Sequence, residues 1–319
     1  MGAVLTRLKR IAFIFLVFFL VSCGVEHKPP LRVGINLWPG YEPFFLARDM
    51  GEYKELPISL IEYPSPSGAI RAMRNGTVEA VALTLDEVLS LIESGVKAKV
   101  VLVINISDGG DAILTRPDIL SLEQLRGKAV VSESSVLANY LLSRALDETD
   151  LGLSDIERLY LPISEHLQAY ERNQADAIVT FEPVRTKLIN AGARELFSSA
   201  QIPGEIVDVL IVRDDVIEAE PEVVQALVDG WYNALQQLHK YPDKTAEKLS
   251  EHLQITPEEV LSSFSRLNWP GRSRVSEMLN ENNAAIEPMA KRIQHIMLKQ
   301  QQLGHEYAFK SLFTDRFVK

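Results

Sequence analysis

Short apolar runs alternate with stretches of helical periodicity over the first two thirds of the chain. The runs are rich in Val, Ile and Leu, which is typical of strands covered on both faces. They predict strands at residues 31–37, 58–63, 78–84, 99–106, 128–132, 158–161, 177–181 and 207–213. Between them, patterns that often end on Gly or Asn-Gly predict helices at 41–51, 67–75, 85–95, 136–147, 165–173 and 183–191. The alternation indicates two successive α/β units.

From Pro221 onward the pattern is almost wholly helical, and we expect this part to pack around the first α/β unit. The chain is expected to enter a second lobe near Asp111 and to return near Asp208, which makes a hinge of two adjacent crossings. The predicted domains are lobe 1, residues 31–112 and 206–319, and lobe 2, residues 113–205. Ligands bind outside the carboxyl ends of strands in open sheets, so the cleft between the lobes is the expected site.

The N-terminal residues resemble a bacterial lipoprotein leader. Basic residues precede an apolar run at 11–21, which is short for a membrane span of about 20 residues. The run ends in Leu20-Val21-Ser22-Cys23, which resembles a lipobox. We therefore expect a signal peptide at 1–22, a lipidated Cys23 and a tether at 23–30. A plain secretory signal or an uncleaved anchor is the alternative. Gly24 favours the outer membrane, if the cell has one, and either way the body of the chain is expected on the periplasmic side.

Composition narrows the class of partner and of chemistry. The chain has 33 basic and 43 acidic residues, a formal net charge of −10, so nucleic acid and anionic lipid surfaces are poor partners. Cys23 is the single cysteine of the chain, and a lipidated sulfur offers neither a nucleophilic thiolate nor a disulfide partner.

Enzyme motifs are missing from the sequence. Gly127-Lys128 lacks the upstream glycine and the following Ser or Thr of a phosphate loop, and no Gly-x-Gly-x-x-Gly follows a predicted strand. The six histidines are scattered, with no pair at zinc-binding spacing. We predict no catalysis, no cofactor and no metal.

Three segments carry a resemblance to a known family: G-I-N-L-W-P-G-Y-E-P-F-F-L-A-R-D-M-G (residues 34–51), S-D-G-G-D-A-I-L-T-R-P-D-I-L-S-L-E-Q-L-R-G-K-A-V-V (107–131) and D-A-I-V-T-F-E-P-V (176–184). The chain resembles the solute-binding proteins of ABC importers that group nitrate, sulfonate and taurine receptors with thiamine-precursor synthase relatives. The pyrimidine synthases of this group carry a cysteine-rich motif, which a chain with only Cys23 lacks.

The resemblance implies a type II-like periplasmic binding protein of two α/β lobes, with the helical C-terminal part packed on lobe 1. It also implies that the protein captures a small molecule in the cleft, closes about its hinge and delivers the ligand to an inner-membrane ABC permease. A ligand-sensing subunit for a membrane signalling receptor is an alternative, because it needs the same closing lobes. A sulfonate, taurine or nitrate receptor is the second alternative.

Candidate ligand-binding residues follow the predicted strands. The rings of Trp38 and Tyr41 are expected at the cleft mouth, with Phe181 as a further aromatic wall. Helix starts with free N–H groups are expected to offer polar cradles on both lobes, formed by Ser65, Ser67, Thr84, Ser134 and Ser135. For these residues, packing between the lobes and ordinary helix capping remain open.

Acidic residues bear on the charge of the ligand. Asp108, Asp111, Glu133 and Glu182 fall in predicted strand ends or in the hinge, where Arg116 is the only nearby base. A receptor for a small strong anion should offer donors and positive potential. The acids therefore favour a cationic, zwitterionic or neutral nitrogen-containing ligand, unless they merely cap helices or bond hinge amides.

Overall fold

The computed structural model describes residues 29–319, and Leu31–Lys319 form one compact unit that contains all the elements below. The predicted signal peptide and Cys23 lie outside the described residues. Within the part of the chain that is described, no helix has the length and apolar character to span a membrane.

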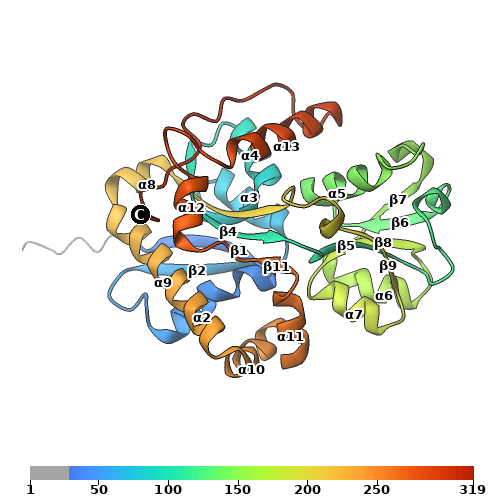
Figure 1. Ribbon diagram of the computed structural model, residues 1–319, viewed down its shortest axis with the longest axis horizontal. Coiled ribbons are helices and arrows are strands. Elements are labelled where there is room, and N and C mark those ends of the chain that lie inside the picture. The colour runs from blue at the N-terminus through green and yellow to red at the C-terminus, as the bar shows by residue number, and fades with distance from the viewer. Residues whose placement is uncertain (1–28) are drawn as a thin grey trace, which may run out of the picture. The chain divides into compact units, whose positions relative to one another are not determined.

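A first sheet of six strands has the order β11-β4-β10-β3-β1-β2 (Figure 1). Its strands are β1 (Leu31–Asn36), β2 (Ile58–Tyr63), β3 (Ala80–Thr84), β4 (Ala98–Ser107), β10 (Val207–Arg213) and β11 (Leu267–Asn268). β1 pairs in parallel with β2 and β3, whereas β10 runs antiparallel between β3 and β4. Because β1 to β3 run the same way, their carboxyl ends meet at one edge of the sheet.

Helices cover this sheet, and together they make up what we call lobe 1. The helices are η1 (Pro39–Tyr41), α2 (Glu42–Met50), α3 (Pro66–Arg74), α4 (Leu85–Glu93), α8 (Asp214–Ala219), α9 (Pro221–Lys240), α10 (Pro242–Leu253), α11 (Pro257–Phe264), α12 (Arg272–Met278) and α13 (Glu287–Lys299). In α9, apolar residues recur every three or four positions, so one face is buried. Trp231 on that face is fully buried and lies 6.4 Å from Phe44 of α2, measured between ring centroids.

A second sheet of five strands, with its helices, makes up what we call lobe 2. Its order is β7-β6-β8-β5-β9, with β5 (Asp111–Thr115), β6 (Ala129–Ser132), β7 (Glu157–Tyr160), β8 (Ala177–Phe181) and β9 (Arg194–Ser198). β6 pairs in parallel with β7 and β8, and β5 runs antiparallel to β8 and β9. Its helices are η2 (Leu122–Leu125), α5 (Val136–Leu146), η3 (Leu153–Asp155), η4 (Ile163–Glu165), α6 (His166–Glu171), α7 (Val184–Asn190) and η5 (Ser199–Gln201).

Two segments connect the sheets: residues 108–110 join β4 to β5, and residues 199–206 join β9 to β10. The Ser199 hydroxyl lies 2.8 Å from the Ser107 hydroxyl and accepts a 2.7 Å hydrogen bond from the Gly109 amide. The Ser107 amide donates to the Ile206 carbonyl at 2.9 Å. The two connections therefore lie side by side and are bonded to each other, in the places expected for a hinge.

The structure differs from the expected elements in three ways. β9 and β11 were not predicted, and both sheets are mixed, with β10 and β5 antiparallel to their neighbours. β5 begins at Asp111, two residues before the predicted start of lobe 2. The α/β fold class is confirmed, and the division into two moving lobes stays a prediction.

Candidate functional site

Trp38 and Tyr41 lie between the lobes and are both held by Asp208 of β10. The Trp38 indole N–H donates to Oδ2 at 3.1 Å, and the Tyr41 hydroxyl donates to Oδ1 at 2.5 Å. A Cβ atom on Gly40 would lie 2.1 Å from Asn105 Nδ2 and 2.4 Å from Trp38 Nε1, so only glycine fits there. The Trp-Pro-Gly-Tyr sequence thus fixes both rings against one carboxylate.

Four acidic residues, which we call the inner acids, are buried around this point: Asp86, Glu87, Asp111 and Asp208. Each side chain is at most 3% exposed. Asp86 and Glu87 begin α4, at the carboxyl end of β3, and Asp111 begins β5. One carboxylate oxygen on each of Asp86, Glu87 and Asp111 has no hydrogen-bond partner. Unpaired buried carboxylates are costly, so this arrangement calls for a counter-charge.

Burial shifts the ionisation of all four inner acids. It raises the pKa of Asp111 to about 7, although a hydrogen bond with Ser107 opposes the shift. It also raises the pKa of Asp86, Glu87 and Asp208, and for the latter two the negative charge of neighbouring acids adds to the effect. In the absence of a cation, the cluster therefore holds protons well above the usual range for carboxyl groups.

A small cavity of about 20 Å³ opens among these residues, with room for about one water molecule. Trp38, Tyr41, Thr84, Asp111 and Phe181 line it, together with Glu87 and Asp208. No Lys, Arg or His is found among the described residues that line this inner cavity. The Phe181 ring stands edge-on to Trp38 of the opposite lobe, with centroids 5.8 Å apart. The inner cavity is thus aromatic and acidic, and it is enclosed by both lobes.

A neighbouring cavity of about 10 Å³ is lined by Glu133, Ser135, Asp111 and His166. Burial lowers the pKa of His166 to about 4, and its ring nitrogens contact Thr180 and Leu161, so this histidine is neutral. Glu133 has one unpaired oxygen, and burial raises its pKa. The described lining of this cavity therefore contains carboxyl groups and no Lys or Arg, while Arg71 of α3 lies near enough to Glu133 to favour its charged form.

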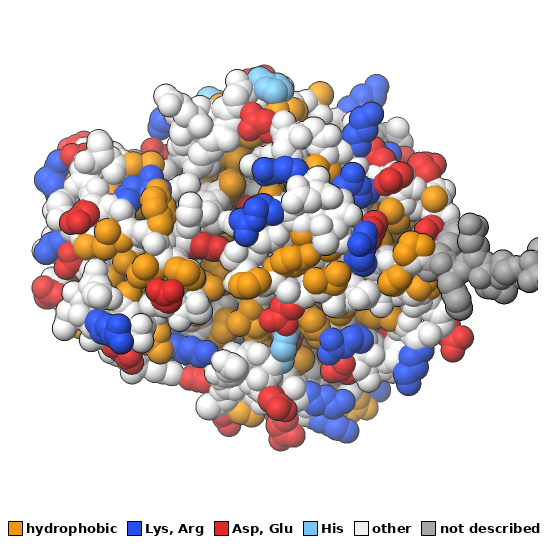
Figure 2. Space-filling view, turned by 180° about the vertical axis from the view of Figure 1, so that it is seen from behind, with side chains coloured by type: hydrophobic (Ala, Val, Ile, Leu, Met, Phe, Trp, Pro, Cys, Tyr) orange, Lys and Arg blue, Asp and Glu red, His pale blue; other side chains and the backbone are white. Residues whose placement is uncertain are grey.

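An outer groove of about 460 Å³ lies beside these cavities, between the lobes. Asn36 and Phe181 line both the groove and the inner cavity, and Ser65 and Glu133 also border the groove. Hydrophobic side chains gather in a band across the middle of the rear face of the molecule, over both lobes (Figure 2).

Two of the predicted polar cradles are used within the protein, whereas the hydroxyl of Thr84, which lines the inner cavity, has no hydrogen-bond partner. The Ser65 hydroxyl accepts from the Gly68 amide at 3.3 Å, and the Ser135 hydroxyl accepts from the Ala138 amide at 3.1 Å, so both cap helices. The Ser67 hydroxyl donates to the Ser134 carbonyl across the interface at 3.3 Å. The two helix starts therefore contact each other directly.

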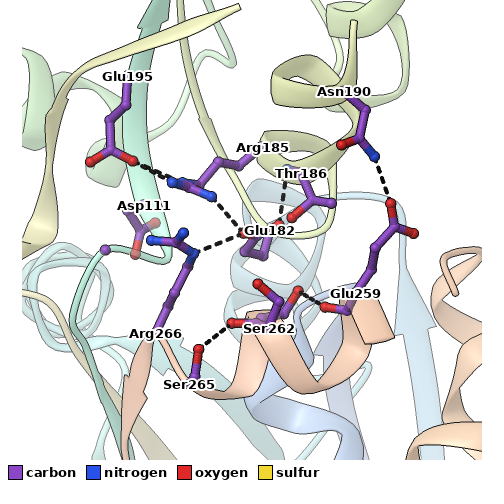
Figure 3. Close-up of polar contacts among 12 residues, drawn as sticks. Asp111, Glu182, Arg185, Thr186, Asn190, Glu195, Glu259, Ser262, Ser265 and Arg266 are labelled. Carbon is purple, nitrogen blue, oxygen red and sulfur yellow. Dashed lines mark hydrogen bonds and ion pairs between the residues drawn. The ribbon is translucent and has the colours of Figure 1, made fainter. Parts of the chain in front are cut away.

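Glu182 lies apart from the cavities, in a network of polar contacts (Figure 3). Its side chain is fully buried and accepts from Arg185 Nη1 at 3.2 Å and from the Thr186 amide at 3.0 Å. Arg266 of lobe 1 approaches the same carboxylate, with Nε 3.7 Å from Oε1. Asn190 of α7 also donates to Glu259 of α11 at 2.6 Å. These contacts bind the lobes to each other and leave Glu182 no free oxygen for a ligand.

Asp108 and Arg116 also differ from expectation. Asp108 is exposed in the connection between β4 and β5 and lines none of the three spaces. Arg116 follows the far end of β5, donates to the carbonyls of Ala175 and Tyr170, and stacks on the Tyr170 ring. Arg116 therefore lies away from the three spaces and faces none of the acids named above.

Three of the inner acids were not predicted as site residues. Asp86 and Glu87 follow Thr84 as in a capping box, and Glu87 Oε2 does accept from the Thr84 amide at 3.1 Å, so the sequence indicates only a helix start. Asp208 was considered only as a crossing point. The sequence does contain an indication that Asp208 belongs to a site, because it is a lone acid inside the apolar run Val207–Arg213. Among the described residues, no group of three or more His, Cys, Asp or Glu is arranged to hold a metal ion.

Comparisons with known proteins agree with this architecture. The sequence model of the NMT1-like family matches residues 24–254. The taurine-binding periplasmic protein of Escherichia coli K12 is 24% identical over 196 residues, which are 60% of this chain and 61% of that protein. The match thus spans less than two thirds of this relative.

Solved structures of binding proteins share the fold. The periplasmic aliphatic sulphonate-binding protein SsuA from Escherichia coli superposes with a TM-score of 0.74 at 16% identity, covering 91% of this chain and 99% of that one. The alkanesulfonate-binding protein SsuA from Xanthomonas axonopodis pv. citri, bound to MOPS, gives 0.73 at 16% identity, covering 87% and 96%. The described residues therefore have the fold of periplasmic binding proteins.

Proposed function

The chain belongs to the NMT1-like family, and we therefore propose that it is the extracytoplasmic solute-binding component of an ABC importer. The ligand enters between the lobes, the lobes close around it, and the closed form delivers it to an inner-membrane permease. Two observations support this: the fold is that of periplasmic binding proteins, and aromatic and polar side chains of both lobes converge on one enclosed space.

We propose further that the ligand carries a cationic nitrogen. One observation carries this step: the inner acids are buried, three of them have an unpaired oxygen, and no basic side chain of the described residues lines the inner cavity. A protonated amine supplies both the missing charge and the missing donors. The rings of Trp38 and Phe181 add the electron-rich walls that favour cations, and such contacts contribute on the order of 2 kcal/mol when desolvated.

A simple anion fits this environment poorly. Sulfonate or nitrate needs N–H or guanidinium donors, and the described lining of the inner cavity contains three carboxyl groups and no Lys, Arg or His. Carboxylates beside an anion would repel it. A zwitterion is compatible only when its ammonium group points at the inner acids.

A thermal-shift screen tests this proposal. Methylammonium and longer primary amines should raise the unfolding midpoint of the wild type, and nitrate and alkyl sulfonates should not. Asp111→Asn should reduce the amine-induced shift, because Asp111 Oδ2 has no partner within the protein and a charge-assisted hydrogen bond of about 1.5–3 kcal/mol to the amine is lost. Asp108→Asn is the matched control, since Asp108 is exposed and lines no cavity, and it should keep the full shift. Stabilisation by sulfonates alone would contradict the proposal.

We also propose that a lipid on Cys23 tethers the protein to a membrane on the periplasmic side, with Gly24 favouring the outer membrane. The support is the Leu-Val-Ser-Cys sequence after a basic and apolar leader. Cys23→Ser should abolish incorporation of radiolabelled palmitate and release the protein from the membrane fraction, with ligand affinity unchanged because the cysteine precedes both lobes. Label retained on the serine variant would refute the anchor.

A further inference from the structure

The space between the lobes has two parts, which differ in volume and in the side chains that line them. The inner cavity, about 20 Å³, is surrounded by acids and aromatic rings, and the outer groove, about 460 Å³, borders it. Phe181 and Asn36 belong to the lining of both. A ligand that reaches the inner acids from the groove must therefore pass Phe181, whose ring is half-buried and rests edge-on against Trp38.

The inner cavity limits the size of the group that enters it. Its volume suits one water-sized group, and an ammonium group has about that size. A sulfonate has four heavy atoms and does not fit. A cationic head can therefore occupy the inner cavity in the closed form only if the rest of the molecule lies elsewhere.

The outer groove has the volume and the lining to take that remainder. Leu37 of lobe 1 and Ile163, Leu167 and Val184 of lobe 2 contribute half-buried apolar side chains to it. A volume of about 460 Å³ falls within the range of small-molecule pockets. The described lining of the groove carries one basic side chain, Lys187, beside Glu62 and Glu133, whereas the inner cavity has acids alone, so the inner cavity is the more favourable place for the cationic head.

We propose that the ligand is an amphiphilic amine, with its ammonium group among the inner acids and an apolar chain or ring in the outer groove past Phe181. This inference rests on the proposed function and adds the class of molecule that the site takes. The acids give charge selectivity, and the groove gives affinity that grows with the apolar surface of the ligand.

Calorimetric titration with a homologous series tests this. Methylammonium, ethylammonium and butylammonium share one head group and differ only in the chain. Each methylene that enters the groove should lower the dissociation constant about fourfold, so butylammonium should bind at least 30-fold more tightly than methylammonium. Leu167→Ser should reduce this gain. Leu120→Ser is the matched control, because Leu120 of lobe 2 is 56% exposed and outside the groove.

The outcomes separate the two proposals. Binding of methylammonium and butylammonium with equal affinity would overturn the inference and leave the cationic site standing. If Leu120→Ser reduced the affinity gain as much as Leu167→Ser, the inference would also be overturned, because the alkyl chain of the ligand would not lie in the groove. Absence of binding by every amine would contradict the proposed function itself.

Discussion

Asp208 organises the site at the scale of single residues. Both of its oxygens accept from aromatic side chains, Trp38 and Tyr41, so two rings are in place before a ligand arrives. Asp111 differs, because its Oδ2 has no partner and lies on the cavity wall. We infer that Asp208 positions the rings, and that Asp111 is free to meet the ligand.

Asp111→Asn should make the stability of the ligand-free protein less dependent on pH. The ordinary pKa of this carboxyl is 3.8 and its folded value is about 7, so the unfolded state ionises first. The stability that the protonated form contributes is present below pH 3.8 and is lost as the pH rises toward 7. The variant should therefore melt a few degrees higher than the wild type near pH 8, by differential scanning calorimetry, and near pH 4 the two should differ less.

The same variant should bind amines roughly tenfold or more weakly, because a charge-assisted hydrogen bond is lost. Asp108→Asn, at an exposed carboxylate three residues away, controls for the general loss of one negative charge. A melting temperature for Asp111→Asn that falls at every pH would mean that this carboxylate is stabilising in its own right.

The sequence predicts the ring positions better than the acids. Trp38, Tyr41 and Phe181 follow strands, and the direction of a strand fixes which end of the sheet they reach. Whether an acid faces a ligand depends on partners that are distant in the sequence. Glu182, for example, is approached by Arg266, which lies 84 positions further along the chain. Capping patterns also conceal acids such as Glu87, because the same Thr-x-x-Glu spacing begins many helices.

At the scale of elements, the lobes are held together by contacts between the start of α7 and the region of α11. Arg266, two residues after α11, approaches Glu182, and its carbonyl accepts from the Asp108 amide of the connection at 2.8 Å. Buried charges of this kind depend on their partners, and removal of one partner is costly. The contacts therefore favour the closed arrangement of the lobes.

Arg266→Gln should weaken the closed form. Glu182 keeps Arg185 as a partner, so the protein is expected to fold, but the attraction across the interface is lost. Amine affinity should fall severalfold, and the radius of gyration of the ligand-free protein should rise in small-angle scattering. Arg126→Gln, which removes an exposed ion pair with Asp155 inside lobe 2, should change neither quantity. Equal effects of both substitutions would show that the contact between Arg266 and Glu182 does not stabilise the closed form.

Most helices and strands could be predicted, because a run of apolar residues indicates which segment of the chain is buried in a sheet. The strands at 58–63, 177–181 and 207–213 have the predicted bounds. β9 was missed because Arg194–Ser198 is short and half polar, and β11 because two residues carry no periodicity. Their pairing with β5 and β4 is a matter of tertiary contacts, which local propensity does not record.

At the scale of the whole molecule, the size of the inner cavity implies motion. A space of about 20 Å³ enclosed by both lobes admits no ligand unless the lobes separate, and the two bonded connections are the natural axis. We therefore propose that the structure represents a closed form, and that lobe 1 and lobe 2 move as two bodies.

Small-angle scattering should detect this motion. The radius of gyration of the ligand-free protein should exceed that of the protein saturated with butylammonium, because the open form is populated only without ligand. Taurine or another alkyl sulfonate at the same concentration serves as the ionic control. Identical scattering curves with and without a bound ligand would indicate a rigid protein.

The charge of the ligand is the central claim, and one matched pair of titrations tests it most directly. Butylamine and butanesulfonate have the same alkyl chain and head groups of opposite charge. Calorimetric titration of the ligand-free protein with each at neutral pH therefore isolates the effect of the head-group charge. The inner acids predict binding of butylamine, weakened on substitution of Asp111 by Asn, and no measurable heat with butanesulfonate. Tight binding of butanesulfonate that survives Asp111→Asn would contradict the account.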